Sequence, residues 1–294
     1  MIRELKTLVA VAREGTFAAA GQRIGLTQAA VSAQMQRLEA ELGFALFERR
    51  GRNAQLNTQG HRTLRQAQDL LRLYETLGSI TPGQAPNVLL TIGAIASVQR
   101  ALLPGVLARF QRDCPNCRTR VLPGVSLELL NQVDAGELDL AAIIRPPFAL
   151  HGDLRWTTLA REPYRLLVPR KLPGEDWRDL LASQPFVRYD RSSFGGRQVD
   201  RFLRQLHFTP REVCELDELE AIVQLVAHGV GVALLPQTAS LRRWPAGVRA
   251  LDLGEQTFHR EVGLVHRAPA SLGEPVRRLA QLIAGRAQRL DERQ

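Results

Sequence analysis

The chain has 294 residues, 45% of them hydrophobic, and carries 39 basic against 30 acidic residues, a formal net charge of +9. This length exceeds a typical single domain, and the apolar content suffices for substantial cores. The sequence has no run of 18 apolar residues and no N-terminal export pattern, which predicts a cytoplasmic protein without a membrane partner. Its three cysteines are an odd number and indicate no disulfide framework.

Residues 16–42 predict two short amphipathic helices separated by a turn at Gly25, with Thr27 as the cap of the second helix. The outward face of that second helix is nearly uncharged and consists of Gln28, Ala29, Ser32, Ala33 and Gln36. In a DNA major groove, amides can read adenine and alanine methyl groups can contact thymine methyl groups. The segment therefore indicates a helix-turn-helix DNA reader, and an ordinary helical hairpin in a core is the alternative.

Residues 43–58 predict a strand, a tight turn and a second strand. The turn carries Arg49, Arg50 and Arg52 around a glycine. Beside a recognition helix, such a basic wing is expected to contact DNA phosphates. A solvated run of charge is the alternative.

Residues 4–60 resemble the LysR-type transcriptional regulator family, and the resemblance continues along essentially the whole chain. It is carried by Thr16-Phe17, Ala19-Ala20, Leu26-Thr27-Gln28, Val31-Ser32, Leu38-Glu39, Leu42-Gly43, Leu46-Phe47-Glu48-Arg49, Leu56 and Gly60. The resemblance implies an α/β protein overall: a winged helix-turn-helix at 1–58, a linker (dimerisation) helix at 59–78, a hinge at 79–87 and an effector-binding regulatory domain at 88–294.

The recognition helix departs from the family pattern at Ala29, where many relatives have proline, and at Ala33, where they have a longer polar residue. Base reading is then expected from Gln28, Ala29 and Gln34, with Ser32, Arg37 and the wing arginines on phosphates. The full predicted DNA-binding set is Thr27, Gln28, Ala29, Ser32, Ala33, Gln34, Arg37, Arg49, Arg50 and Arg52. Weak direct readout makes DNA shape and half-site spacing correspondingly more important.

The predicted linker helix carries an apolar stripe of Leu64, Ala67, Leu71 and Tyr74, widened by Leu70 and Leu77. The resemblance implies that this helix pairs with its copy in a second subunit, giving a dimer or a tetramer. Packing of the stripe on its own domain is the alternative. Two prolines and a glycine follow within residues 79–87, which is typical of a hinge.

From Val88 onward, strands and helices alternate, which predicts parallel sheets with helices on their faces. The pattern restarts at Tyr164 and indicates two lobes, lobe I at about 88–161 and 267–294 and lobe II at about 162–266. Two such lobes resemble the effector domain of LysR-type regulators, which itself resembles a periplasmic solute-binding protein. This architecture holds ligands between the lobes, at the carboxyl ends of strands.

Four loops are therefore expected to hold a small anionic effector. Ser97 is predicted to cap a helix or to face the cleft, and Arg145 to pair with the effector or to face solvent. The glycine-rich loop around Ser193 can cradle an anion or form an ordinary turn. The predicted effector-binding set is Ala94, Ser97, Arg145, Ser192, Ser193, Phe194, Asp217 and Glu218, of which the last two cap a helix, line the cleft, or both.

Two other classes of protein compete with a regulator. An enzyme is disfavoured because the six histidines are dispersed and the sequence has no GxSxG, HExxH or Walker motif; no catalytic residue and no cofactor are predicted. Cys114 and Cys117 lack a second ligand pair, so no metal site is predicted, although a thiol switch stays open. A solute-binding protein is disfavoured by the missing export signal. The expected partners are a double-stranded DNA operator, a small-molecule effector, further copies of the chain and, as a candidate, RNA polymerase.

Overall fold

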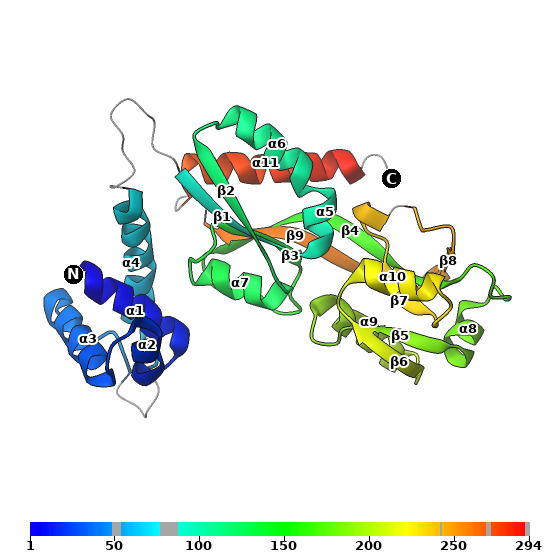
Figure 1. Cartoon of the computed structure of the whole chain (residues 1–294), viewed down its shortest axis with the longest axis horizontal. Coiled ribbons are helices and arrows are strands. Elements are labelled where there is room, and N and C mark those ends of the chain that lie inside the picture. The colour runs from blue at the N-terminus through cyan, green and yellow to red at the C-terminus, as the bar shows by residue number, and fades with distance from the viewer. Residues whose placement is uncertain (49–53, 77–87, 242, 269–271, 292–294) are drawn as a thin grey trace. The chain divides into compact units, whose positions relative to one another are not determined.

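The computed structural model describes residues 1–48, 54–76, 88–241, 243–268 and 272–291. The predicted wing tip with Arg49, Arg50 and Arg52 and the predicted hinge at 79–87 lie outside the described residues. The chain divides into two compact units, one formed essentially by Met1–Val88 and the other by Leu89–Asp134 and Leu138–Gln294 (Figure 1).

The first unit is mainly helical where it is described, and an antiparallel bridge between Phe47 and Leu56 joins the two sides of the predicted wing. Its helices are α1 (Ile2–Glu14), α2 (Phe17–Ile24), α3 (Gln28–Leu42) and α4 (Thr58–Thr76). Gly25 ends α2 with a φ of 71°, and the Thr27 hydroxyl accepts the Ala30 N–H at 3.2 Å at the start of α3. These two local signals produce the predicted helix-turn-helix, because a left-handed glycine and a hydroxyl cap stop one helix and start the next.

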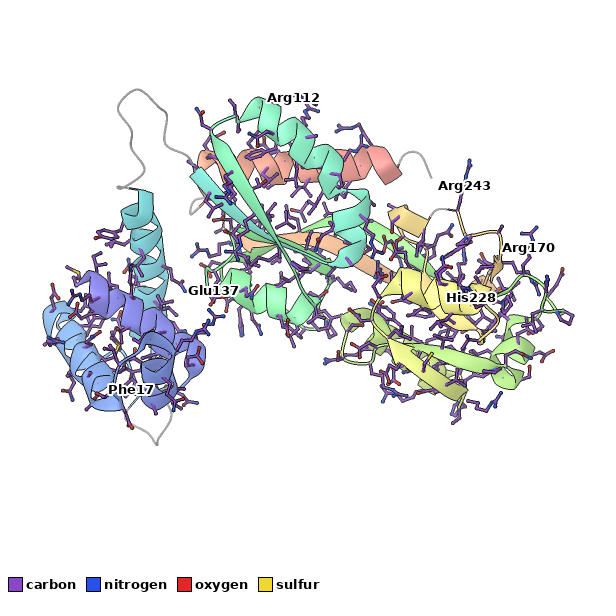
Figure 2. All side chains as sticks on the ribbon, viewed as in Figure 1. Phe17, Arg112, Glu137, Arg170, His228 and Arg243 are labelled. Carbon is purple, nitrogen blue, oxygen red and sulfur yellow. The ribbon has the colours of Figure 1, made fainter. Side chains whose placement is uncertain are left out.

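The core of this unit joins all four of its helices. Its buried residues include Leu8, Val11, Val31, Met35, Leu38, Leu46, Leu64 and Ala67. Phe17, labelled in Figure 2, packs edge-to-face on Phe47 with ring centroids 5.2 Å apart. The Leu64 and Ala67 part of the α4 stripe therefore packs on its own domain. Leu70 and Tyr74 are 43% and 47% exposed, so the part of α4 around them offers apolar surface. Leu77 of the predicted stripe lies outside the described residues.

The second unit contains nine described strands and seven described α-helices. The strands are β1 (Val88–Ala94), β2 (Cys117–Pro123), β3 (Leu140–Ile144), β4 (Leu154–Pro169), β5 (Pro185–Tyr189), β6 (Arg211–Leu216), β7 (Ala233–Pro236), β8 (Val248–Leu251) and β9 (His259–Arg267). The helices are α5 (Ala96–Ala101), α6 (Leu103–Asp113), α7 (Ser126–Asp134), α8 (Trp177–Ser183), α9 (Phe194–Gln205), α10 (Leu219–Ala227) and α11 (Glu274–Asp291). The predicted break near Pro104 is confirmed, since α5 ends at Ala101 and α6 begins at Leu103 with Pro104 in its first turn.

The sheets are mixed rather than uniformly parallel. The main sheet has the order β2-β1-β3-β9-β4-β7, with β8 on β4, and a second sheet pairs β5 with β6. β1–β3 and β5–β6 are parallel as predicted, but β9 runs antiparallel to both β3 and β4. In lobe I, α6 and α11 cover one face of the sheet and α7 the other (Figure 1).

Two long strands connect the lobes. β4 pairs with β9 up to Pro163 and then with β7 and β8 from Tyr164 onward. β9 pairs with β3 from Val262 to His266, within the sheet of lobe I. The chain thus returns to lobe I near residue 260, earlier than the sequence-based boundary at 267. The lobe junction therefore falls on the paired strands around Glu162 and Arg260.

Among the described helices, none combines the length and the apolar character that a membrane span requires.

Candidate DNA-binding helix and effector cleft

The outward face of α3 combines amides and small side chains. Gln28, Ala29, Ala33, Gln36 and Arg37 are exposed, and Ser32 is half-buried beside them. Arg37 lies 4.0 Å from Glu4 and is otherwise presented to solvent. Gln36 was not in the predicted binding set, yet it lies two turns after Ala29 on the same face.

Gln34 does not lie on the exposed face of α3, where a residue that reads bases would have to lie. It is half-buried, and the Thr7 hydroxyl of α1 donates to its Oε1 at 2.5 Å. Six residues rotate a helix by about 240° relative to the starting position, which turns Gln34 away from the Gln28 face. Its side chain therefore ties α3 to α1.

A cavity of about 350 Å³ lies between the two lobes of the second unit. Its lining comes from the carboxyl ends of β1, β3 and β5 and from the loops before α5, α7, α9 and α10, as expected for this architecture. The volume falls in the range of small-ligand sites. The polar residues that line it are Ser97, Ser126, Glu128, Tyr189, Ser193, Asp217, Glu218 and Arg260.

Ser97 faces this cavity but does not cap α5. Ile95 holds the N-cap position, and Ser97 is the second residue of the helix. The Ser97 hydroxyl instead accepts a hydrogen bond from Nη2 of Arg260 at 3.0 Å. The capping alternative for Ser97 is therefore wrong, and its cleft alternative agrees with the position of the side chain.

Arg260 is the main residue that the sequence reasoning missed. It is 1% exposed, and its Nε donates to Glu162 Oε2 at 2.5 Å across the strand pair β4–β9. The nearby Tyr164 and Tyr189 hydroxyls have raised pKa values, chiefly because both phenols are buried. The available signal was an arginine within the predicted last strand at 260–265, since a charge that a sheet buries needs a buried partner.

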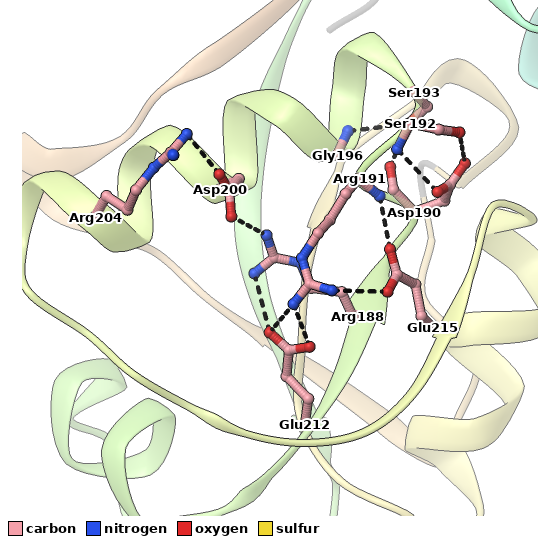
Figure 3. Close-up of polar contacts among 10 residues, drawn as sticks. All are labelled: Arg188, Asp190, Arg191, Ser192, Ser193, Gly196, Asp200, Arg204, Glu212 and Glu215. Carbon is pink, nitrogen blue, oxygen red and sulfur yellow. Dashed lines mark hydrogen bonds and ion pairs between the residues drawn. The ribbon is translucent and has the colours of Figure 1, made fainter.

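Ser192 and Ser193 build the loop that precedes α9 (Figure 3). The Ser193 hydroxyl accepts the Gly196 N–H at 3.0 Å and donates to the Asp190 carbonyl at 2.8 Å. The Ser192 N–H and hydroxyl both donate to the Asp190 carboxylate. These bonds agree with the N-cap and ordinary-turn alternative, and of the two serines only Ser193 lines the cavity.

Carboxylates from both lobes face the cavity. Glu128 comes from lobe I, and Asp217 and Glu218 come from lobe II. Glu218 holds the N-cap position of α10 without a side-chain cap bond, and it pairs with Arg100 of lobe I at 3.0 Å. Arg100 also pairs with Glu220. Burial raises the pKa of Asp217, and the charges of Asp190 and Glu218 raise it further.

The remaining predicted effector residues lie elsewhere. Ala94 is fully buried at the end of β1, where its carbonyl accepts from the Gln99 side chain at 2.7 Å. Arg145 and Phe194 line a neighbouring pocket instead of the cleft, and Arg145 forms an ion pair with Glu261 at 2.9 Å. The sequence placed Arg145 at the mouth of the cleft because it follows β3, but pairing with β9 directs it to the other side.

The histidine and cysteine candidates occupy structural positions. His228, labelled in Figure 2, holds the C-cap position of α10, and its Nδ1 lies 2.7 Å from the Gln224 carbonyl. Cys117 is buried and Cys114 half-buried. Burial and the neighbouring Cys114 raise the pKa of Cys117, which lowers its thiolate fraction. Within the described residues, no cluster of three metal-ligating side chains occurs.

Comparison with known protein families matches both units. Residues 2–61 match the bacterial regulatory helix-turn-helix protein model of the lysR family, and residues 83–288 match the LysR substrate binding domain model. A helix-turn-helix followed by a two-lobed substrate-binding domain defines a ligand-responsive class of bacterial transcriptional regulators. The chain belongs to the LysR family of this class and is thus a DNA-binding transcriptional regulator rather than an enzyme.

Individual relatives agree with this assignment. The HTH-type transcriptional regulator CfxR of Cupriavidus necator is 31% identical over 92% of this chain and 87% of its own length. Full-length LysG of Corynebacterium glutamicum, solved with the effector Arg bound, covers 98% of both chains with a TM-score of 0.65 at 19% identity. Full-length CbnR complexed with its target DNA covers 97% of this chain and 99% of its own, with a TM-score of 0.55 at 22% identity.

Proposed function

We propose that a small metabolite binds in the cleft between the lobes and changes how the regulator engages its operator. The observation that carries this proposal is the cavity lined by helix starts and strand ends of both lobes, with Arg260 and Ser97 at its floor. The Arg100–Glu218 ion pair also joins the lobes beside it. A ligand that contacts both walls binds the closed arrangement of the lobes more tightly than the open one. An effector needs this difference in affinity to shift the equilibrium between the two arrangements.

The charges of the cleft favour an effector with both a carboxylate and a protonated amine. The sequence reasoning predicted an anionic effector, but the charge of Arg260 is already balanced by Glu162. Glu128 and Asp217 add negative charge from opposite lobes. An ammonium group between these carboxylates relieves their repulsion, while the carboxylate of the ligand takes hydrogen bonds at the Ser97 end.

A thermal-shift screen of the full chain tests this ligand class. Amino acids, including arginine because of the LysG complex, are compared with their deaminated acids and with amines that lack the carboxylate. A ligand at about 100 times its Kd stabilises the protein by about 2.7 kcal/mol. Selective stabilisation by the zwitterions supports the proposal. Selective stabilisation by simple carboxylic acids would indicate an anionic effector instead. If none of these compounds stabilises the protein, the proposed ligand class is wrong.

Asp217→Asn is expected to lower the affinity for such a zwitterion and to raise slightly the stability of the ligand-free protein. The carboxylate has a raised pKa because it is buried near Asp190 and Glu218, so removing its charge relieves repulsion at neutral pH. The ammonium group requires the charged carboxylate, so wild-type affinity should fall as the pH falls through this raised pKa. Calorimetric titration between pH 4.5 and 7.5 measures the affinity, and thermal unfolding without ligand measures the stability. An affinity in Asp217→Asn equal to wild type would remove Asp217 from the site.

For operator recognition, we propose that the Gln28 and Gln36 amides on α3 read bases while Ser32, Arg37 and the wing arginines hold phosphates. Gln28→Ala should reduce discrimination between operator and random DNA by about 1–3 kcal/mol. Gln66→Ala, an exposed glutamine on α4, is the matched control. Gln34→Ala should instead lower the stability of the first unit, because it removes the bond to Thr7. Competition gel shifts measure discrimination, and equal effects of Gln28→Ala and Gln66→Ala would contradict the assignment.

We further propose that the regulator self-associates as a dimer or tetramer through α4 and acts on DNA in the cytoplasm, with RNA polymerase as a candidate partner. The exposed Leu70 and Tyr74 on α4 support pairing of two copies along the distal part of this helix. The earlier part of the stripe is already used in the core of its own domain. Sedimentation of Leu70→Glu tests this arrangement, since a charge there should dissociate the copies.

A further inference from the structure

A second pocket, separate from the effector cleft, also bridges the two lobes. It has a volume of about 490 Å³. Lobe I and the crossing strands contribute Arg145, Arg161 and Glu261, and α9 of lobe II contributes Arg197 and Arg201. Phe194, Phe258 and His259 complete one wall. The pocket shares no lining residue with the effector cleft.

The charge of this pocket is strongly unbalanced. Four arginines line it, and Glu261 is the single acidic residue among its described lining residues. The Glu261 carboxylate is already occupied, because it accepts from Arg145, from the Trp156 indole at 2.8 Å and from the Thr158 hydroxyl at 2.6 Å. The contacts of Arg197 with the Phe194 ring at 5.8 Å add no negative charge. Three arginine charges are therefore uncompensated by the pocket itself.

The surroundings respond to this positive potential. His259, half-buried in the pocket wall, has a lowered pKa because of its burial and because of the charges of Arg161 and Arg165. Guanidinium groups carried by β4 in one wall and by α9 in the other repel each other across the gap. An oxyanion with two charges would replace this repulsion with bidentate hydrogen bonds from both walls.

We infer that this pocket is a second ligand site, which takes a small oxyanion of two or more charges and thereby clamps the lobes together. Phosphate and dicarboxylates share the required chemistry, namely several oxygen acceptors within the reach of planar guanidinium forks. An anion bound at this site shifts the equilibrium between open and closed lobes, which the effector also shifts. The anion site itself rests on the pocket and holds whether or not the effector is a zwitterion, whereas its coupling to the effector rests on the proposed function.

Anion titration of the full chain tests the site. Inorganic phosphate, succinate and chloride are compared at equal ionic strength by thermal shift and by isothermal calorimetry. Saturable stabilisation by phosphate, by succinate or by both, but not by chloride, supports the site and identifies which anion class it prefers. A shift that is identical for all three salts, or that does not saturate, overturns the inference.

Variants from each wall separate this site from a general salt effect. Arg161→Gln and Arg201→Gln should each weaken anion affinity by about tenfold or more. Without the anion, each should raise the melting temperature slightly by relieving repulsion. Arg112→Gln, an exposed arginine of α6 labelled in Figure 2, is the matched control and should leave both quantities unchanged. Equal anion affinity in all three variants would overturn the inference.

Discussion

At the scale of single residues, the lobe junction contains the buried ion pair of Arg260 and Glu162. Its nitrogen and oxygen lie 2.5 Å apart, and both side chains are more than nine-tenths buried. Burial of such a pair costs desolvation free energy that only an intact partner offsets. Ser97 takes one further Arg260 donor, so the same guanidinium links the fold of the junction to the floor of the effector cleft.

Glu162→Gln should therefore reduce the free energy of unfolding of the second unit by about 3 kcal/mol, since it leaves a buried arginine charge uncompensated. Glu274→Gln, which breaks the exposed Arg277 pair of α11, should cost about 0.5 kcal/mol or less. All three tryptophans, Trp156, Trp177 and Trp244, lie in this unit, so urea unfolding followed by fluorescence reports on it. Similar costs for the two variants would mean that the Arg260 charge does not need Glu162 as its buried partner.

At the scale of elements, the start of α9 depends on close backbone approach. A Cβ atom on Gly196 would lie 1.8 Å from the Asp190 carbonyl oxygen, so the helix start and the Asp190 loop cannot keep their contact with a larger residue. On Gly285, within α11, an added Cβ would be 3.8 Å from the nearest side-chain atom, Arg289 Nη1. The two helical glycines thus have opposite consequences on substitution.

Gly196→Ala should destabilise the second unit by about 2 kcal/mol or more and weaken effector binding, because Ser193 leaves its place in the cleft. Gly285→Ala should stabilise the same unit by about 0.5–1 kcal/mol, since alanine loses less backbone entropy in a helix. Melting temperatures of both variants check the signs. A neutral Gly196→Ala with unchanged effector affinity would show that the α9 start tolerates displacement.

At the scale of the whole regulatory unit, the lobes are held by contacts that differ in strength. The strands β4 and β9 form a covalent and hydrogen-bonded connection, whereas the Arg100 pairs with Glu218 and Glu220 are surface ion pairs. Such pairs contribute about 0–1 kcal/mol to stability. They nevertheless join residues of opposite lobes. Their loss should therefore change the equilibrium between open and closed lobes more than the free energy of unfolding.

Arg100→Gln should therefore change the melting temperature very little while altering effector affinity by up to about fivefold, which corresponds to a coupling of about 1 kcal/mol. Arg109→Gln, which breaks an exposed pair within α6, serves as the control. Calorimetric titration with the ligand found in the screen measures the difference. An affinity change of the same size in Arg109→Gln would show that the Arg100 pairs do not couple the lobes.

The sequence by itself determined the helix starts, helix ends and turns, because these depend on residues close together in the chain. The cap at Thr27, the glycine turn at Gly25 and the apolar period of α3 predicted the helix-turn-helix, because each acts within a few residues of its own position. Most helices and strands of the second unit followed in the same way. The first half of β4 did not, since its alternating polar residues form a strand only through pairing with β9.

Only the tertiary structure decided the chemistry of the cleft. Arg260 and Glu162 are 98 residues apart, and Arg100 and Glu218 are 118 apart. No local period encodes such pairings, because they arise when antiparallel strands and facing lobes bring distant side chains together. The same long-range pairing placed Arg145 in a second pocket and brought Glu128 of one lobe and Asp217 of the other to the lining of the cleft.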